Sequence, residues 1–195
     1  MKAVIFDVDG VLIKSKDVLG EYLWNKNIEK DLGLTADHMR LMYTADWSLV
    51  LKGLLDVRQY FKTRFDALNI ALSVDVFIEY WLRCDSIVDS EVIQVLEAIK
   101  GPKLYIGTNQ ERRRTLFIRE KFKSYFDGIF SSYQVGAIKP EPEFYRYIES
   151  NLKIQAKDIA FIDDSKSHIE AAVRLGWTCH HYRNIKDLND FVQKL

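Results

Sequence analysis

Short apolar segments recur along this chain of 195 residues, and most of them run directly into acidic or hydroxylated residues. The first covers residues 2–6 and leads into Asp7. These segments lack the apolar-polar alternation of a half-exposed strand and are typical of strands buried on both faces of a parallel sheet. The later segments of this kind cover residues 103–107, 128–130, 159–162 and 176–180.

Amphipathic helical patterns separate these segments. The pattern over residues 90–99 predicts a helix that stops at Gly101 and Pro102. A second predicted helix opens at Ser165 and stops at Gly176. Strands that alternate with helices predict right-handed βαβ units, so we expect an α/β fold with a doubly wound, Rossmann-like parallel sheet. In such sheets, ligands bind beyond the carboxyl ends of the strands.

Residues 16–86 interrupt this alternation with helical patterns alone. We therefore predict two domains, a core of residues 1–15 and 87–195 and a small α-helical cap of residues 16–86 that lies over the sheet. We assign most of the aromatic residues of the insertion to its own core, with one or two lining an entrance. The first helical pattern of the insertion joins Val18, Leu19, Tyr22 and Leu23.

The charge balance excludes several kinds of partner. The 28 Lys and Arg residues equal the 28 Asp and Glu residues, and the isoelectric point is near 6.9. Binding to nucleic acid or to a membrane surface needs a basic excess, so we expect neither partner. No segment resembles a signal peptide or a membrane span, and Cys84 and Cys179 are far apart. These features predict a cytoplasmic protein, either a monomer or a homodimer.

The first candidate site follows the first predicted strand as Asp7-Val8-Asp9-Gly10-Val11. Two carboxylates this close suit a hard divalent cation, or a nucleophile with an acid and base, and Gly10 allows a sharp turn. An ordinary turn is an equal alternative. A calcium-binding loop is excluded, because position 11 is Val and the glycine of such a loop is misplaced.

Two further candidates follow along the chain. Thr108 and Asn109 end a predicted strand, where a hydroxyl and backbone amides can grip an anionic oxygen, although both residue types are also common in loops. Lys139 lies between an apolar run and Pro140 and Pro142, which restrict its backbone and help to aim its ammonium at a phosphate. The alternative for Lys139 is an exposed surface lysine.

Asp163 and Asp164 form the last candidate, directly after the strand predicted over residues 159–162. Adjacent acids repel each other unless a cation is near. Capping of the helix that opens at Ser165 explains one acid and leaves the other without a role.

The order of these patches along the chain resembles that of the haloacid dehalogenase superfamily of phosphotransferases. Residues 125–139 also resemble the subgroup whose helical cap is inserted after the first motif. The motifs that carry the resemblance are Asp7-Val8-Asp9-Gly10-Val11, Thr108-Asn109, Lys139-Pro140-Glu141-Pro142 with Phe144-Tyr145, and Asp163-Asp164-Ser165.

The resemblance implies the catalytic residues and a cofactor. Asp7 is then the nucleophile that forms an aspartyl-phosphate, and Asp9 protonates the leaving alkoxide and later activates water. The cofactor is Mg²⁺, bound by Asp7, by the backbone carbonyl of Asp9 and by Asp164, with Asp163 close by.

The same resemblance implies how phosphate is bound. Thr108 and the amide of Asn109 hold the non-bridging oxygens, and Lys139 offsets charge in the transition state. The implied function is that of a magnesium-dependent phosphatase, a phosphoric monoester hydrolase that acts on a small phosphorylated metabolite.

Three other functions are less well supported. A 2-haloacid dehalogenase of this superfamily keeps no acid at the position of Asp9. A sugar phosphomutase must reorient a phosphorylated intermediate, and no motif demonstrates this. A non-catalytic module that binds a phosphorylated ligand typically loses Asp7 or Lys139.

His168 stands where the family often has Asn or Asp a few residues after the last acid pair. We expect this difference to affect the positioning of the loop after Asp163 and Asp164 more than the activity.

Two other clusters have simpler explanations. Arg112, Arg113 and Arg114 cover most of a helical turn, so we expect a solvated face, with Arg112 as a minor candidate for contact with an anionic substrate. His180 and His181 are adjacent on a predicted strand and point to opposite faces, so they do not converge on a metal.

Overall fold

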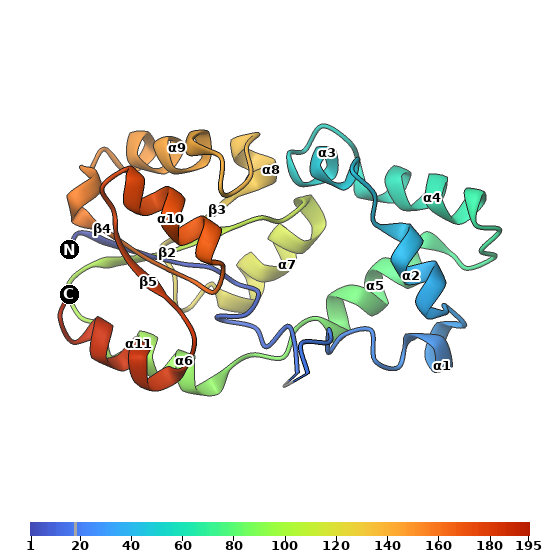
Figure 1. The fold of residues 1–195 in the computed structure, drawn as a ribbon, viewed down its shortest axis with the longest axis horizontal. Helices are drawn as coiled ribbons and strands as arrows, with labels where there is room; N and C mark the ends of the chain where they lie inside the picture. Colours follow the sequence, from blue (N-terminus) through green and yellow to red (C-terminus); the bar gives the residue numbers. More distant parts are fainter. Residues whose placement is uncertain (18) are drawn as a thin grey trace.

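The computed structural model describes residues 1–17 and 19–195 (Figure 1). In this part of the chain, five strands form one parallel sheet in the order β3-β2-β1-β4-β5. Every segment that the sequence predicts as a strand contributes to this sheet, which confirms the predicted α/β fold. The strands are β1 (Ala3–Phe6), β2 (Lys103–Thr108), β3 (Gly128–Ser131), β4 (Ile159–Asp163) and β5 (Thr178–His181).

The strand order reverses at β1, in the centre of the sheet. The chain adds β2 and β3 on one side of β1 and then crosses to add β4 and β5 on the other side. Phe6 pairs with both Ile106 and Ile162, so the residues that follow β1, β2 and β4 emerge side by side. This is the point where doubly wound sheets bind ligands.

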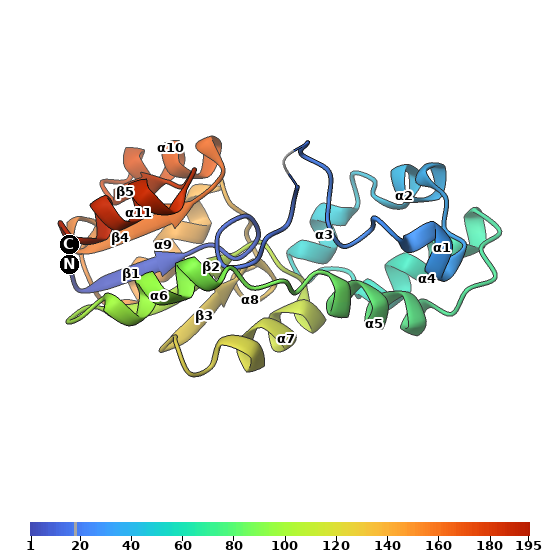
Figure 2. The ribbon, with the colours of Figure 1, turned by 90° about the horizontal axis from the view of Figure 1, so that it is seen from below.

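Helices cover both faces of the sheet (Figures 1 and 2). Alternate residues of β1 point to opposite faces, so Val4 and Phe6 join one hydrophobic cluster and Ala3 and Ile5 join the other. The first cluster includes residues of α6 (Ser90–Ala98), α7 (Arg112–Phe122) and α11 (Ile185–Val192). The second includes residues of α9 (Pro142–Leu152) and α10 (Lys166–Arg174), and the short elements α8 (Ser132–Val135) and η1 (Ala156–Asp158) connect the strands.

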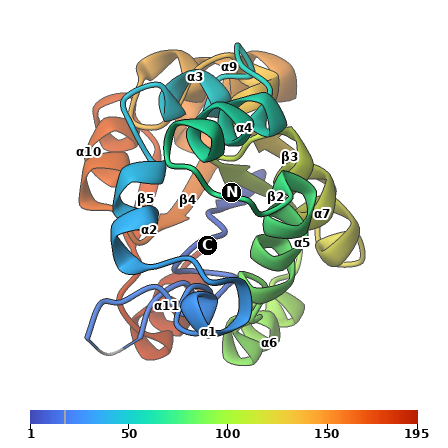
Figure 3. The same ribbon diagram turned by 90° about the vertical axis from the view of Figure 1, so that its right-hand side faces the viewer.

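The inserted residues form helices that pack around a hydrophobic cluster of their own. These helices lie beyond the carboxyl ends of the strands, at the right of Figure 1 and in front of the sheet in Figure 3. Phe61 and Phe77 are fully buried in this cluster, with ring centroids 4.8 Å apart. The helices are α1 (Ile28–Leu32), α2 (Ala36–Met42), α3 (Trp47–Leu51), α4 (Val57–Ala67) and α5 (Val74–Cys84).

The helix predicted from Val18, Leu19, Tyr22 and Leu23 is wrong where the structure describes it. Leu19, Tyr22 and Leu23 lie in an irregular segment, and Val18 lies outside the described residues. The Asp17 carboxylate accepts hydrogen bonds from the backbone of Leu19 at 2.8 Å and of Glu21 at 3.0 Å, and such local bonds compete with a helix.

The chain enters and leaves the helical insertion through two paired segments. The Lys14 N–H donates to the Ile87 carbonyl at 2.8 Å, and the Asp89 N–H donates to the Leu12 carbonyl at 2.9 Å. The two connections therefore lie side by side beneath the inserted helices. Within the described residues, every helix is too short or too polar to cross a membrane.

Candidate active site

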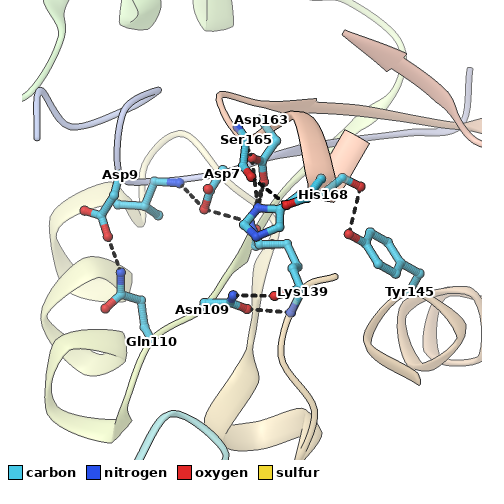
Figure 4. A network of polar contacts seen from close by, with 12 residues as sticks. Asp7, Asp9, Asn109, Gln110, Lys139, Tyr145, Asp163, Ser165 and His168 are labelled. Carbon is cyan, nitrogen blue, oxygen red and sulfur yellow. Dashed lines mark hydrogen bonds and ion pairs between the residues drawn. The ribbon is translucent and has the colours of Figure 1, made fainter. Parts of the chain in front are cut away.

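Polar residues from three strand ends meet at the buried ammonium of Lys139 (Figure 4). Lys139 is only 2% exposed, so its interpretation as a surface lysine is wrong. Its Nζ donates to Asp163 Oδ2 at 2.6 Å and to the Gly107 carbonyl at 2.9 Å, and it lies 2.9 Å from Asp7 Oδ1. Lys139 thus joins the ends of β1, β2 and β4.

The side chain of Asn109 holds the backbone of Lys139 in place (Figure 4). Asn109 Oδ1 accepts from the Lys139 N–H at 2.8 Å, and Nδ2 donates to the Lys139 carbonyl at 2.9 Å. The peptide bond between Lys139 and Pro140 is cis. The Asn109 side chain is therefore committed to the lysine loop, and its backbone amide is the group left to face a ligand.

The charges at this junction are unevenly compensated. Burial lowers the pKa of Lys139, but the carboxylates of Asp163 and Asp7 raise it above its ordinary value. Burial raises the pKa of Asp163, yet Lys139 and His168 hold it well below the ordinary range. Burial raises the pKa of Asp7 well above its ordinary value, and Lys139 opposes this only in part. Asp7 is therefore the less compensated of the two buried carboxylates, and a cation beside it would favour its ionised form.

Asp163 is fully buried and organises its surroundings. Its Oδ1 accepts from the Ser165 N–H at 2.8 Å, and Nδ1 of His168 lies 3.0 Å from Oδ1 and 3.1 Å from Oδ2. Ligand atoms of Asp7, Asp163 and His168 lie within 4.8 Å of one another. His168 therefore supports the fourth motif through Asp163, which was not evident from the sequence.

Gly10 shapes the loop that follows β1. Its φ angle is +81°, in the left-handed region, and its N–H donates to the Ile13 carbonyl at 2.8 Å. A Cβ atom on Gly10 would lie 2.2 Å from Asp164 Oδ2. Glycine is thus needed here both for the turn and for the close approach of the Asp164 carboxylate.

Asp9 is held by two residues of the segment after β2. Its Oδ2 accepts from Gln110 Nε2 at 2.5 Å (Figure 4), and its Oδ1 accepts from Arg114 Nη2 at 2.5 Å. The other terminal nitrogen of Arg114 contacts Asp85 Oδ2 at 2.9 Å and donates to the Asp85 carbonyl at 3.0 Å. Arg114 is only 1% exposed and bridges two acids that are far apart in sequence.

The prediction that the arginine run forms a solvated face is therefore wrong for Arg114. Arg112, the residue favoured from the sequence, is exposed. Arg114, Ile118 and Phe122 are four residues apart and all buried on one face of α7. This spacing of four residues from two apolar side chains distinguishes Arg114 from Arg112 and Arg113, and it could have predicted from the sequence that Arg114 is buried.

One cavity of about 250 Å³ brings most of the predicted residues together. Thr108 is 1% exposed at the end of β2 and reaches the wall of this cavity. Lys139 and Asp163 lie behind Asp7, outside the lining. The lining residues are Asp7, Asp9, Ser15, Lys16, Tyr22, Asp85, Thr108, Asn109, Asp164 and His168.

The donor groups of the cavity suit a hard divalent cation. Asp7 and Asp164 present carboxylate oxygens, and the intervening loop carries the backbone carbonyl of Asp9. Burial and the adjacent Asp163 raise the pKa of Asp164, as expected where negative charge is in excess. Oxygen ligands with surplus negative charge favour a cation such as Mg²⁺.

A comparison with protein-family models identifies the family of the chain. The model of the haloacid dehalogenase-like hydrolases matches residues 1–176. The chain belongs to this family. The resemblance inferred from the motifs is thus confirmed, and the protein is a hydrolase.

Individual relatives are similar to this chain over nearly its full length, two in sequence and one in structure. A phosphorylated carbohydrates phosphatase of Thermotoga maritima is 28% identical over 201 aligned residues, covering 97% of this chain and 88% of the relative. A sesquiterpene phosphatase of Aspergillus oryzae is 24% identical and covers 92% and 89%. A family enzyme of Bacteroides thetaiotaomicron, solved with magnesium and inorganic phosphate, has a TM-score of 0.77 with 18% identity and covers 94% of each chain.

Proposed function

We propose that this hydrolase is a magnesium-dependent phosphatase of small phosphate monoesters and that it acts through an aspartyl-phosphate on Asp7. The observation that carries this proposal is the single cavity of about 250 Å³, which gathers Asp7, Asp9, Thr108 and Asp164 in front of the buried Lys139. The phosphatase relatives and the neighbour with magnesium and phosphate support it.

Asp7 attacks the phosphorus atom and displaces the leaving alcohol, which divides one difficult displacement into two easier ones. The Thr108 hydroxyl and the Asn109 backbone amide hold the non-bridging oxygens. Lys139 lies 2.9 Å from Asp7 and offsets the negative charge that gathers there.

Asp9 donates a proton to the leaving oxygen and then takes one from the attacking water. In the structure its second oxygen accepts from Gln110 and its first from Arg114, so one of these two bonds must open for Asp9 to carry and deliver the proton. We assign both as positioning residues, since they act on the substrate only through Asp9.

The oxygen donors of the cavity fit Mg²⁺. Asp7, the backbone carbonyl of Asp9 and Asp164 would hold it, with Asp163 close by. When bound, Mg²⁺ supplies the positive charge that lets an anionic carboxylate approach an anionic phosphate.

The inserted helices act as a cap domain in this proposal, with residues 16–86 closing over a core of residues 1–15 and 87–195. Lys52 Nζ contacts Glu141 Oε1 of the lysine loop at 2.6 Å. The Ser132 hydroxyl donates to the Leu51 carbonyl at 2.7 Å. Closure would exclude water from the cavity and enclose the leaving group.

The balanced charge and the two free cysteines, Cys84 and Cys179, support a cytoplasmic protein. Its partner in this proposal is the small phosphorylated substrate alone, and either a monomer or a homodimer is compatible with it.

Phosphate release from a panel of phosphate monoesters tests the function. Activity should require Mg²⁺ and disappear on chelation, and Asp7→Asn should reduce it by more than about a thousandfold. Asp190→Asn, on the exposed side of α11, is the matched control and should retain activity. Turnover that survives chelation or Asp7→Asn would contradict the proposal, and halide release from a 2-haloacid would identify a dehalogenase instead.

A further inference from the structure

A second cavity of about 560 Å³ adjoins the small one. The two share Asp9, Tyr22, Asp85 and Asn109 in their walls. A phosphate monoester with its phosphoryl group beside Asp7 therefore extends its leaving group past Asp9 into the larger cavity. Its volume lies within the range of ordinary small-molecule sites.

Aromatic rings form much of the wall of this larger cavity. They come from the irregular segment before α1, from the residue that follows α2, and from α3 and α5, so the inserted segment supplies most of the wall. The apolar lining residues are Tyr22, Trp24, Met39, Tyr43, Trp47, Leu51 and Trp81.

The rings support one another and are fixed before any ligand enters. Tyr43 and Trp47 pack edge to face with centroids 5.1 Å apart, and Trp47 and Trp81 lie 6.1 Å apart. Trp24 packs on Trp81 at 6.4 Å. A preformed aromatic wall favours flat ligands, because little conformational entropy is lost on binding.

The polar side chains of this cavity are largely engaged with one another. Gln110 and Arg114 bind Asp9, and Arg114 also binds Asp85. Trp81 Nε1 donates to Asp85 Oδ2 at 3.2 Å. The Asn109 amide, as described above, is bonded to the Lys139 backbone.

The other polar groups of the described lining lie mostly at the edges of aromatic rings. They are the amide of Asn25, the hydroxyls of Tyr22 and Tyr43 and the indole N–H groups of Trp24 and Trp47, and Arg40 is exposed and contacts Asp37 at 3.2 Å. A leaving group with many hydroxyls would lose its water here without regaining hydrogen bonds of equal number, which weakens its binding.

We propose that the larger cavity binds an aromatic leaving group, so that the preferred substrates are phosphate monoesters of flat aromatic alcohols rather than of sugars. This inference rests on the proposed phosphatase function and specifies the substrate class of that same site. Asp9 lies in the walls of both cavities, and it supplies the proton to the oxygen that leaves with the aromatic alcohol.

The test compares esters of primary alcohols, so that the leaving oxygen is chemically similar throughout. The probes are naphthylmethyl phosphate, benzyl phosphate and glucose 6-phosphate, each with Mg²⁺. We expect kcat/KM to fall in that order, with naphthylmethyl phosphate at least about a hundredfold better than the sugar phosphate.

Two variants locate the source of the preference. Trp47→Ala removes an aromatic wall, and Met39→Lys places a charge on a half-buried wall residue. Each should reduce the ratio of kcat/KM for naphthylmethyl phosphate over glucose 6-phosphate by at least about tenfold, mainly through KM. Since Trp47 packs in the core of the inserted helices, Met39→Lys gives the answer if Trp47→Ala does not fold. Leu54→Ala, at a side chain 72% exposed, is the control and should keep the wild-type ratio.

The outcomes separate the two proposals. Equal or better turnover of glucose 6-phosphate, or an aromatic preference that survives Met39→Lys, overturns the substrate class and leaves the phosphatase function intact. Absence of turnover for all three esters and for the wider panel overturns the phosphatase function itself.

Discussion

Buried charges at the site differ in how completely they are compensated. Asp163 has Lys139, His168 and a backbone amide as partners. Asp7 has the Val8 amide and shares Lys139 with Asp163. This difference explains why Asp163 suits a structural role and Asp7 suits chemistry, since a carboxylate that attacks phosphorus must keep an oxygen free.

Replacing Asp163 with Asn tests the structural role. We expect a loss of about 3–5 kcal/mol in the free energy of unfolding at neutral pH, because the buried Lys139 loses one of its two carboxylate partners. The folded-state pKa of Asp163 is lowered, so its stabilisation is complete above the unfolded value of about 3.9 and is lost as the pH falls toward the folded value.

Urea unfolding of wild-type protein and of Asp163→Asn, at neutral pH and near pH 3, measures this contribution. The difference between the two proteins should shrink at the lower pH. A difference that stays constant or grows as the solution becomes acidic would contradict the assignment.

Arg114→Lys tests whether Arg114 positions Asp9. Lysine keeps the charge but lacks the fork that reaches both Asp9 and Asp85. We expect the single-turnover rate of benzyl alcohol release from benzyl phosphate to fall at least about tenfold, because its leaving oxygen needs a proton from Asp9. For para-nitrophenyl phosphate, whose leaving group needs no proton, the single-turnover rate of nitrophenol release should change by less than about threefold.

The matched control is Arg112→Lys on the same helix, which should leave both rates unchanged because Arg112 is exposed. Equal losses in the single-turnover rate of alcohol release on the two esters would assign Arg114 a purely structural role.

Among the elements, the loop after β1 is the one most restricted by close packing. Gly10→Ala places a Cβ atom against Asp164, and Gly33→Ala adds one at a similar positive φ where nothing lies within 4 Å. Both variants should lose about 1–2 kcal/mol of stability from the left-handed backbone. Only Gly10→Ala should also weaken the binding of Mg²⁺. We expect the Mg²⁺ concentration for half-maximal activity to rise at least about tenfold in this variant. Equal Mg²⁺ dependence of the two variants would contradict the role of Asp164.

The sequence predicted the strands well because each combines an apolar run with a polar end. The helix predicted from the apolar spacing of Leu19, Tyr22 and Leu23 was wrong. The backbone N–H groups of Leu19 and Glu21 bind the Asp17 carboxylate there, and these local bonds compete with a helix. Most of the catalytic candidates were identifiable because they end or directly follow strands, and Lys139 was identifiable from the prolines beside it. Gln110 and Arg114 were not, because their role depends on contacts with Asp9 across 101 and 105 residues of chain that no local pattern reveals. Asp85 was not identified either, because it is linked to this group only through Arg114, 29 residues further along the chain.

Taken as a whole, the molecule has separate hydrophobic clusters in the sheet region and in the inserted helices. The contacts described between the two parts include polar pairs, such as Lys52 with Glu141, Ser132 with Leu51 and Arg113 with Asp75. Polar interfaces of this kind are typical of domains that move relative to each other. The proposed function expects the cap to open in this way to admit a substrate.

Trapping a phosphorylated protein tests most directly whether Asp7 is the nucleophile. Asp9→Asn lacks the base for the second step, so with Mg²⁺ and para-nitrophenyl phosphate it should accumulate the intermediate. After an acid quench and digestion, the peptide that contains Asp7 should carry one phosphoryl group, and Asp7→Asn should carry none. Release of nitrophenol by Asp9→Asn without a phosphoryl group on that peptide, or with the group on another residue, would contradict the mechanism.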